Sequence, residues 1–432
     1  MRVLMFGWEF PPHISGGLGT ACYGLTKALS GFEDVEVTFV VPRIWGNEDL
    51  SGVTFLGANE IQVIQKPVPF PDSKSKVEYY ELNSSLIPYL GTCEFYELKT
   101  NVSGRDARLV ETTEEGKILF GGDYTHSLFQ EIESYALVAE SIANEFSFDV
   151  IHLHDWMTFP AGIAVQRISG KPLIVHVHST EFDRSGSNVN PAICRIEKEG
   201  MMMADELIVV SNYTKNTVVD KYGINPDKIT TVYNAVEPLM VPKNVSFDRN
   251  NVNPVVAFLG RITSQKGPEY FLEAAKLVLR KMGNVRFVMA GKGDLLNAMI
   301  GRAEELGIVD SITFPGFLDD ARIQELFDCS DVFVMPSVSE PFGIVALEAM
   351  LSGVPVIISR QSGVSEILSN AYSINYWDVQ EIADVICKLL ADRQLRCQLI
   401  DSGITEVSKL SWSNAAAEVR KTYLRVLTRE RL

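Results

Sequence analysis

Short apolar segments alternate with longer amphipathic segments in two successive series along this 432-residue chain. A short apolar run bounded by helical periodicity is typical of a buried strand in a parallel sheet. The runs of the first series are Val3–Phe6, Val37–Val41, Val150–Leu153, Leu173–Val177 and Leu207–Val210, and those of the second are Val255–Leu259, Val285–Ala290, Ile312–Phe314, Val332–Met335 and Val354–Ile358. The alternation predicts an α/β protein with two doubly wound Rossmann-like domains.

The two series are separated by residues 236–253, where prolines and asparagines interrupt the periodicity. We interpret this segment as a linker and assign residues 1–242 to the first domain and residues 243–410 to the second. Two such domains face each other across a cleft, which is a usual place for a ligand.

Residues 51–125 depart from the alternation, because their periodicity is weak and turn residues are scattered through them. The segment is too long for an ordinary loop. We interpret it as a structural elaboration of the first sheet. Its tyrosines leave a second interpretation open, a surface that shapes the binding of an acceptor.

Composition excludes several classes of function. The net charge of −16 disfavours nucleic acid as a partner. No apolar stretch reaches the length of a transmembrane helix, and no signal-peptide pattern is present, so we expect a cytoplasmic protein without integral membrane association. The six cysteines are scattered without a Cys-x-x-Cys spacing, which favours reduced thiols over disulfides or a zinc site.

The segment 337–350 places two carboxylates around the start of a predicted helix. Glu340 precedes a Pro-Phe-Gly turn, and Glu348 lies more than a turn into the helix, beside its apolar stripe. Between them, the backbone amides of Phe342, Gly343 and Ile344 are free at a helix N-terminus, which favours a phosphate. A sugar nucleotide carries hydroxyls for the carboxylates and phosphates for the amides.

A matching pair of cations follows the predicted strand Val255–Leu259. Arg261 and Lys266 stand five residues apart in the loop after that strand. From there both can point at a diphosphate, the guanidinium as a bidentate fork and the ammonium as a point charge.

The Arg-x4-Lys and Glu-x7-Glu pair resembles the retaining nucleotide-sugar glycosyltransferases of the GT-B fold, and the resemblance extends from Met1 to about residue 420. It implies that Glu340 contacts hydroxyls of the donor sugar, with a nucleophilic role left open, and that Glu348 contacts the ribose. It also implies front-face transfer, no cofactor, and a helix within residues 411–432 that crosses back to the first domain. No Asp-x-Asp motif is apparent, so we expect no metal requirement.

The first domain carries its own candidates. Gly16 and Gly17 precede a predicted helix, but Cys22 stands where a dinucleotide-binding fingerprint requires a third glycine. Glycogen and starch synthases have a similar Gly-Gly-Leu near the donor diphosphate, usually two residues after a lysine, where this chain has Ile14. The resemblance also places Asn234 near the donor.

His154-Asp155-Trp156 ends a predicted strand and is similar to a motif of the glycogen and starch synthases. The resemblance implies that His154 contacts the donor sugar and that Asp155 anchors the loop. His178 and Glu181 follow the next strand and are further candidates for donor or acceptor contacts. We expect His152 and His154 to face opposite sides of their strand, which disfavours a shared metal ion.

These features predict a glycogen synthase-type hexosyltransferase that moves glucose from ADP-glucose or UDP-glucose to an α-glucan. The alternative is a related retaining family 4 glycosyltransferase acting on a lipid, a surface polysaccharide or a small molecule. The sequence leaves open the donor base, the donor sugar, the acceptor and the oligomeric state.

Overall fold

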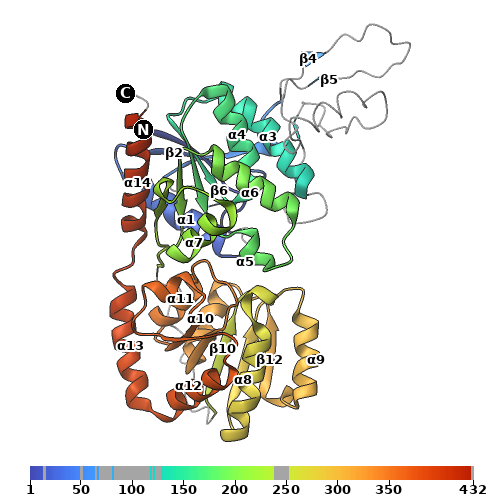
Figure 1. The fold of residues 1–432 in the computed structure, drawn as a ribbon, viewed down its shortest axis with the longest axis vertical. Coiled ribbons are helices and arrows are strands. Elements are labelled where there is room, and N and C mark those ends of the chain that lie inside the picture. Colours follow the sequence, from blue (N-terminus) through green and yellow to red (C-terminus); the bar gives the residue numbers. More distant parts are fainter. Residues whose placement is uncertain are drawn as a thin grey trace, which may run out of the picture.

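The structure is a computed structural model that describes residues 1–12, 16–48, 52–63, 66–67, 80–81, 117–118, 120–121, 128–237 and 253–429. Two α/β domains stand one above the other, each built around a parallel sheet (Figure 1). The predicted fold class, two Rossmann-like domains, is confirmed.

The first sheet has seven parallel strands in the order β3-β2-β1-β6-β7-β8-β9. The strands are β1 (Arg2–Phe6), β2 (Glu36–Val41), β3 (Thr54–Gly57), β6 (Val150–His154), β7 (Leu173–Val177), β8 (Glu206–Val209) and β9 (Ile229–Thr231). The helices around it are α1 (Gly17–Leu29), α3 (Leu128–Glu145), α4 (Phe159–Ser169), α5 (Glu181–Ser185), α6 (Pro191–Met203) and α7 (Asn212–Tyr222). Strand order reverses between β1 and β6, and ligands of such sheets bind beyond the carboxyl ends of the strands at this point.

The second sheet has six parallel strands in the order β12-β11-β10-β13-β14-β15. They are β10 (Val255–Leu259), β11 (Arg286–Ala290), β12 (Ile312–Gly316), β13 (Val332–Met335), β14 (Val356–Ser359) and β15 (Tyr372–Ile374). Its helices are α8 (Pro268–Lys281), α9 (Leu296–Leu306), α10 (Asp320–Cys329), α11 (Ile344–Leu351), α12 (Val379–Ala391) and α13 (Arg393–Val407). Here the order reverses between β10 and β13, so the loops after these two strands meet.

The segment 51–125, expected to elaborate the first sheet, contributes β3 to that sheet and a two-stranded ribbon of β4 (Lys66–Pro67) and β5 (Tyr80–Glu81). Most of the segment lies outside the described residues. Short 3₁₀ helices occur at η1 (Ala58–Glu60), η2 (Trp156–Thr158), η3 (Pro226–Lys228), η4 (Ser264–Lys266), η5 (Val309–Ser311) and η6 (Gly363–Glu366).

The apolar core continues from one domain into the other. One buried cluster joins Met5 and Phe39 of the first sheet to Phe333 and Met335 of the second. Two further clusters fill the opposite faces of the two sheets. The domains are therefore packed against each other through side chains as well as connected by the chain.

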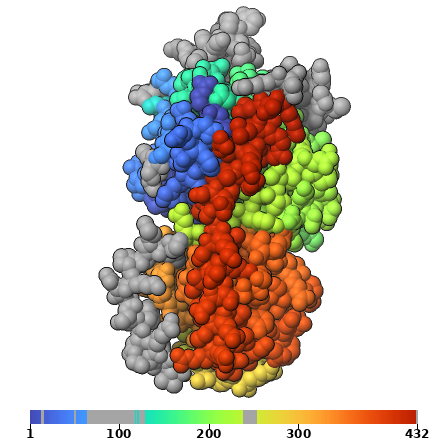
Figure 2. Space-filling model, turned by 90° about the vertical axis from the view of Figure 1, so that its left-hand side faces the viewer, coloured from blue at the N-terminus to red at the C-terminus, as the bar shows by residue number. Residues whose placement is uncertain are grey.

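Helix α14 (Trp412–Arg429) returns to the first domain and packs along α1. Figure 2 shows α13 and α14 as one continuous column that runs over both domains. The contact with α1 is close, because a Cβ at Gly24 would stand 2.3 Å from the ring of Trp412. The buried carboxylate of Glu206 pairs with Arg429 at 2.8 Å, so α14 also neutralises a charge inside the first domain.

Among the described residues, no helix combines the length and the apolar character that a membrane crossing requires.

Candidate active site

A lysine and a glutamate from two different loops meet at the edge of the second sheet. Lys266 ends the η4 turn after β10, and its Nζ lies 2.5 Å from Oε2 of Glu340, in the loop after β13. The amide of Val338 donates to the carbonyl of Gln265 at 2.9 Å, which joins the two loops. Gly267 permits this approach, because its φ is +65° and a Cβ there would lie 2.2 Å from a backbone oxygen.

The carboxylate of Glu340 is held firmly. Its side chain is buried, and Oε2 also accepts a hydrogen bond from Ser337 Oγ at 3.1 Å. Its backbone amide donates to the carbonyl of Gln361, and its carbonyl accepts from the amide of Gly363, both at 2.9 Å. A buried carboxylate requires such partners. Two of the partners of Glu340, Lys266 Nζ and Ser337 Oγ, are side-chain groups that a ligand could displace.

Arg261 lies in the same loop as Lys266. Its guanidinium is exposed, and Nη2 donates to Oε1 of Gln265 at 3.2 Å. The structure thus brings both predicted cations to one loop beside Glu340, with the lysine partly buried and the arginine open to solvent.

Helix α11 begins next to this pair. Gly343 is its N-cap residue with a φ of +113°, and a Cβ there would lie 2.9 Å from Cε of Met335. The adjacent Phe342 is buried, and its carbonyl accepts from the amide of Val364 at 2.8 Å. The first amides of an α-helix have no partner within the helix and carry its positive dipole end. Ile344 starts the helix, so this end suits an anion.

Glu348 lies farther along α11 and is partly buried. Burial raises the pKa of its carboxyl to about 7, and the negative charge of Asp320 adds to the effect. Among the described residues, none donates a hydrogen bond to this carboxylate, so a ligand hydroxyl would supply a partner that the protein does not.

Gly16 and Gly17 lie at the N-terminus of α1, in the first domain. No described atom lies within 4 Å of the place where a Cβ of either residue would stand, so the backbone is open to a ligand here. Residues 13–15, which include Ile14, lie outside the described residues.

Four histidines form a stack, here called the histidine column, on one face of the first sheet. His152 and His154 belong to β6. His176 belongs to β7, and His178 directly follows the last residue of that strand. Ring centroids are 4.5 Å apart for the first two and 4.3 Å for the second two. The expectation that His152 and His154 face opposite sides is wrong, because side chains two positions apart on a strand share a face.

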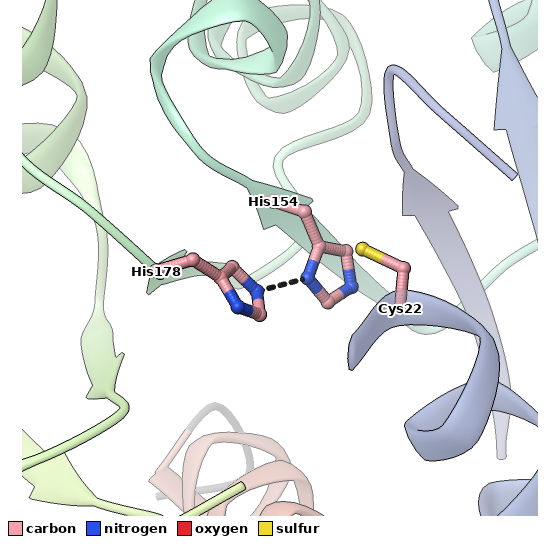
Figure 3. A group of neighbouring side chains, drawn as sticks. All are labelled: Cys22, His154 and His178. Carbon is pink, nitrogen blue, oxygen red and sulfur yellow. Dashed lines mark hydrogen bonds between the residues drawn. The ribbon is translucent and has the colours of Figure 1, made fainter. Parts of the chain in front are cut away.

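The column lies inside the protein. His154 has no exposed surface and His178 has 9%, and His154 Nδ1 lies 2.9 Å from His178 Nε2 (Figure 3). Burial lowers the pKa of all four rings, to about 3 for His152 and His178. The rings are therefore neutral at pH 7, and His178 is the one whose edge reaches the surface.

Asp155 fixes the loop that follows His154. Its Oδ1 accepts hydrogen bonds from the amides of His178 at 2.6 Å and Ser179 at 3.3 Å. Burial raises the pKa of its carboxyl to about 7 against the opposing charge of Arg184. Its φ of +59° with a ψ of +169° is strained for any residue other than glycine.

Glu181 is buried, and its carboxylate is used inside the first domain. Oε1 accepts from Ser185 Oγ at 2.8 Å and from the amide of Asn190 at 3.0 Å, and Oε2 contacts Arg184 Nε at 3.3 Å. The structure therefore gives this residue a role in joining α5 to α6. Asn234 is buried beyond the end of β9, where the chain leaves the first domain.

Several contacts between the domains had no signal in the sequence. Ser339 Oγ donates to Asp183 Oδ1 at 2.6 Å, and Tyr213 OH lies 3.0 Å from the same hydroxyl. Glu366 accepts hydrogen bonds from the amides of Asn212 and Tyr213 at the start of α7. These partners are more than a hundred residues apart in sequence, and no local pattern relates them.

Two family models cover most of the described chain. Residues 116–238 match the model described as Glycosyltransferase Family 4, and residues 243–405 match the model described as Glycosyl transferases group 1.

Curated relatives include proteins of more than one activity. An uncharacterized glycosyltransferase of Methanocaldococcus jannaschii is 29% identical, with 98% of each chain covered. The glycogen synthase of Mycobacterium tuberculosis is 25% identical over 100% of this chain and 96% of its own. A D-inositol 3-phosphate glycosyltransferase of Acidothermus cellulolyticus is 27% identical over 68% of this chain and 71% of its own.

Solved structures share the fold at low sequence identity. Sucrose-phosphate synthase from Thermosynechococcus elongatus aligns with a TM-score of 0.70 and 17% identity, over 99% of both chains. The catalytic domain of starch synthase IV from Arabidopsis thaliana, bound to ADP and acarbose, aligns with a TM-score of 0.67 and 14% identity, also over 99% of both. The chain is therefore a glycosyltransferase of the GT-B fold, whose two domains match the family 4 and group 1 models.

Proposed function

We propose that this protein transfers glucose from a nucleoside-diphosphate glucose to an α-glucan with retention of the anomeric configuration. The observation that carries the proposal is the pairing of Lys266 with Glu340 at 2.5 Å, beside the N-terminus of α11. A cation, a carboxylate and free backbone amides then lie together, and these are the groups that a sugar diphosphate requires.

The leaving diphosphate develops negative charge as the bond to the sugar breaks. Lys266 and Arg261 would neutralise this charge, and the amides at Phe342, Gly343 and Ile344 would donate hydrogen bonds to it. Because both cations come from the protein, the proposed transfer has no metal requirement and uses no cofactor beyond the nucleotide sugar.

The ion pair also suggests how donor binding prepares the site. A diphosphate competes with Glu340 for Lys266, and the carboxylate then becomes free to accept hydrogen bonds from hydroxyls of the donor sugar. The same carboxylate is the candidate nucleophile if transfer runs through a glycosyl-enzyme intermediate. In front-face transfer, the leaving phosphate instead takes the proton of the acceptor.

The remaining candidates would surround the donor. Glu348 would accept hydrogen bonds from the ribose hydroxyls, and Gly16 and Gly17 would approach the diphosphate from the first domain. We assign the direct contact with the sugar to His178, because its ring reaches the surface, and we assign to His154 the task of holding that ring through their 2.9 Å contact. Asn234 would contact the donor beside the linker.

The choice of an α-glucan acceptor is supported by the glycogen synthase relative, which matches over the full length of this chain. The starch synthase structure, bound to ADP and acarbose, shares its fold. The alternative acceptor is a small molecule, a lipid or a surface polysaccharide, and the relatives named D-inositol 3-phosphate glycosyltransferase favour the first of these.

The test measures release of nucleoside diphosphate from ADP-, UDP- and GDP-sugars, each with glycogen, with inositol 3-phosphate or without acceptor. We expect release from a glucose donor that depends on glycogen and lengthens its chains, with an α-linkage in the product by NMR. Release that depends on inositol 3-phosphate, or on a donor other than glucose, would replace the glucan assignment. The Glu340→Gln variant is the inactive control.

A further inference from the structure

The histidine column contains four of the six histidines of the chain. Three of its ring nitrogens, His154 Nε2, His176 Nε2 and His178 Nδ1, are buried without a hydrogen-bond partner among the described residues. An unpaired polar atom in the interior is costly, and native structures contain few of them. The proposed function uses the exposed edge of the His178 ring, but it gives no role to these three buried nitrogens.

A cysteine from a different element stands at one end of the column. Cys22 belongs to α1, and its thiol points toward the ring of His154, which is linked in turn to His178 (Figure 3). The sulfur and one nitrogen from each ring all lie within 4.8 Å of one another, and the three side chains are buried. Two nitrogens and a sulfur form a donor set that prefers zinc among the common divalent cations.

We propose that Cys22, His154 and His178 bind one divalent cation of the zinc class. Three protein ligands leave a fourth position for water or another oxygen donor. His178, with 9% of its surface exposed, marks the side from which an ion enters. The bound ion would join α1 to the ends of β6 and β7, and it would hold the His178 ring in place of that ring's contact with His154.

Binding exchanges one proton for the ion and involves no oxidation or reduction. The Cys22 thiol loses its proton to solvent and binds as a thiolate. Burial raises the pKa of this thiol, and the nearby charges of Asp155 and Glu9 raise it further. The same two carboxylates favour a cation at this position. Burial lowers the pKa of His154 and His178, so both rings are neutral near pH 7 and release no proton of their own when the ion binds.

A second group, His152 with His154 and His176, has similar spacing but is less suitable. Both nitrogens of His152 are occupied, Nδ1 by Tyr423 OH at 2.6 Å and Nε2 by His176 Nδ1 at 3.3 Å. An ion bound there would break the contact between the column and α14. An ion in the Cys22 group would disturb at most the contact between His154 and His178, at 2.9 Å, and would leave the contact with α14 in place.

The experiment uses the full chain, stripped with a chelator and titrated with Co²⁺ and then with Zn²⁺ against a chromophoric competitor. We expect one equivalent of cobalt with a thiolate-to-cobalt charge-transfer band, and a melting temperature that rises with zinc concentration. Apparent affinity should rise about tenfold per pH unit, because one thiol proton is released.

Three variants separate the possible ligands. Cys22→Ser should lose the charge-transfer band, the pH slope and about 100-fold or more in affinity, since even outer-shell changes cost 10- to 100-fold. Cys329→Ser, which changes a partly buried thiol of the second domain, should match the wild type. His178→Asn removes a ligand at the edge of the column and serves if Cys22→Ser does not fold.

The proposal is overturned if the wild type takes up no ion, or if Cys22→Ser or a folded His178→Asn binds as the wild type does. Loss of binding in His176→Asn, with Cys22→Ser unaffected, would move the site to the second group. None of these readouts depends on transferase activity.

Discussion

Ser339 donates a hydrogen bond of 2.6 Å to Asp183 across the two domains, one residue before Glu340. Because the hydroxyl has one proton and Asp183 receives it, the bond between Tyr213 and Ser339, at 3.0 Å, is donated by the tyrosine. The loop that carries Glu340 is therefore held by the first domain as well as by its own.

Replacing Ser339 with alanine should lower kcat/KM for the donor by about 10- to 100-fold, the equivalent of one hydrogen bond to a charged group. The activation free energy should change more than the free energy of unfolding, because the bond joins two domains that each keep their core. Steady-state kinetics and melting curves measure the two effects. Ser365→Ala, which removes a hydroxyl bonded within the second domain, is the matched control. Equal kinetics in the two variants would show that the contact does not position Glu340.

Replacing Lys266 with alanine should lower kcat by about 100- to 1,000-fold, the usual cost of removing one group that stabilises developing charge. Glu340→Gln should abolish measurable transfer but keep nucleotide affinity, since Lys266 is then free for the diphosphate. Lys281→Ala removes an exposed ion pair with Asp384 on the same domain and should have no effect. Circular dichroism checks the folding of each variant. Wild-type turnover in either site variant would contradict the assignment.

The affinity for a nucleotide sugar should depend on pH through Glu348, whose pKa is raised to about 7. Ribose hydroxyls donate to the carboxylate form, so affinity should fall as the pH drops below about 7, approaching tenfold per unit, and should level off above it. Isothermal titration between pH 5.5 and 8.5 measures the profile. Glu348→Gln should bind more weakly at high pH and show a flatter profile; an unchanged profile would exclude the ribose contact.

Asp155 offers a direct measure of backbone strain. Alanine and glycine at this position both lose the hydrogen bonds to His178 and Ser179, but only alanine keeps the strain at a φ of +59°. The glycine variant should therefore be more stable than the alanine variant by about 1 kcal/mol, since a strain of about 1–3 kcal/mol is offset in part by a conformational-entropy cost of about 0.5–1 kcal/mol for glycine. Urea unfolding measures the difference. Alanine equal to glycine would mean that the loop relaxes without the carboxylate.

The architecture was predictable because buried parallel strands leave a strong apolar signal. The predicted run Val255–Leu259 coincides with β10. Three short edge strands, β3, β9 and β15, were missed, since segments such as Ile229–Thr231 are too short for a periodic signal. The predicted interdomain linker, residues 236–253, lies almost wholly outside the described residues.

The candidate site was partly predictable, since short motifs that directly follow predicted strands contain Arg261, Lys266 and Glu340. The contacts that hold them were not predictable: Ser339 and Asp183 are 156 residues apart, and nothing local relates them. The histidine column was missed for a different reason, because His152 and His154 were expected to face opposite sides of their strand. Side chains two positions apart on a strand share a face, so both rings lie on the same side.

The position of α14 has a consequence for biosynthesis. The hydroxyl of Tyr423 is the hydrogen-bond partner of His152 Nδ1, and the guanidinium of Arg429 pairs with the carboxylate of Glu206. Both residues of α14 are translated only after the whole second domain. The first domain therefore leaves the ribosome with an apolar face uncovered and a buried carboxylate unpaired. Its folding should be completed only when this helix emerges, so an isolated fragment of residues 1–237 should aggregate unless α14 is supplied as a separate peptide.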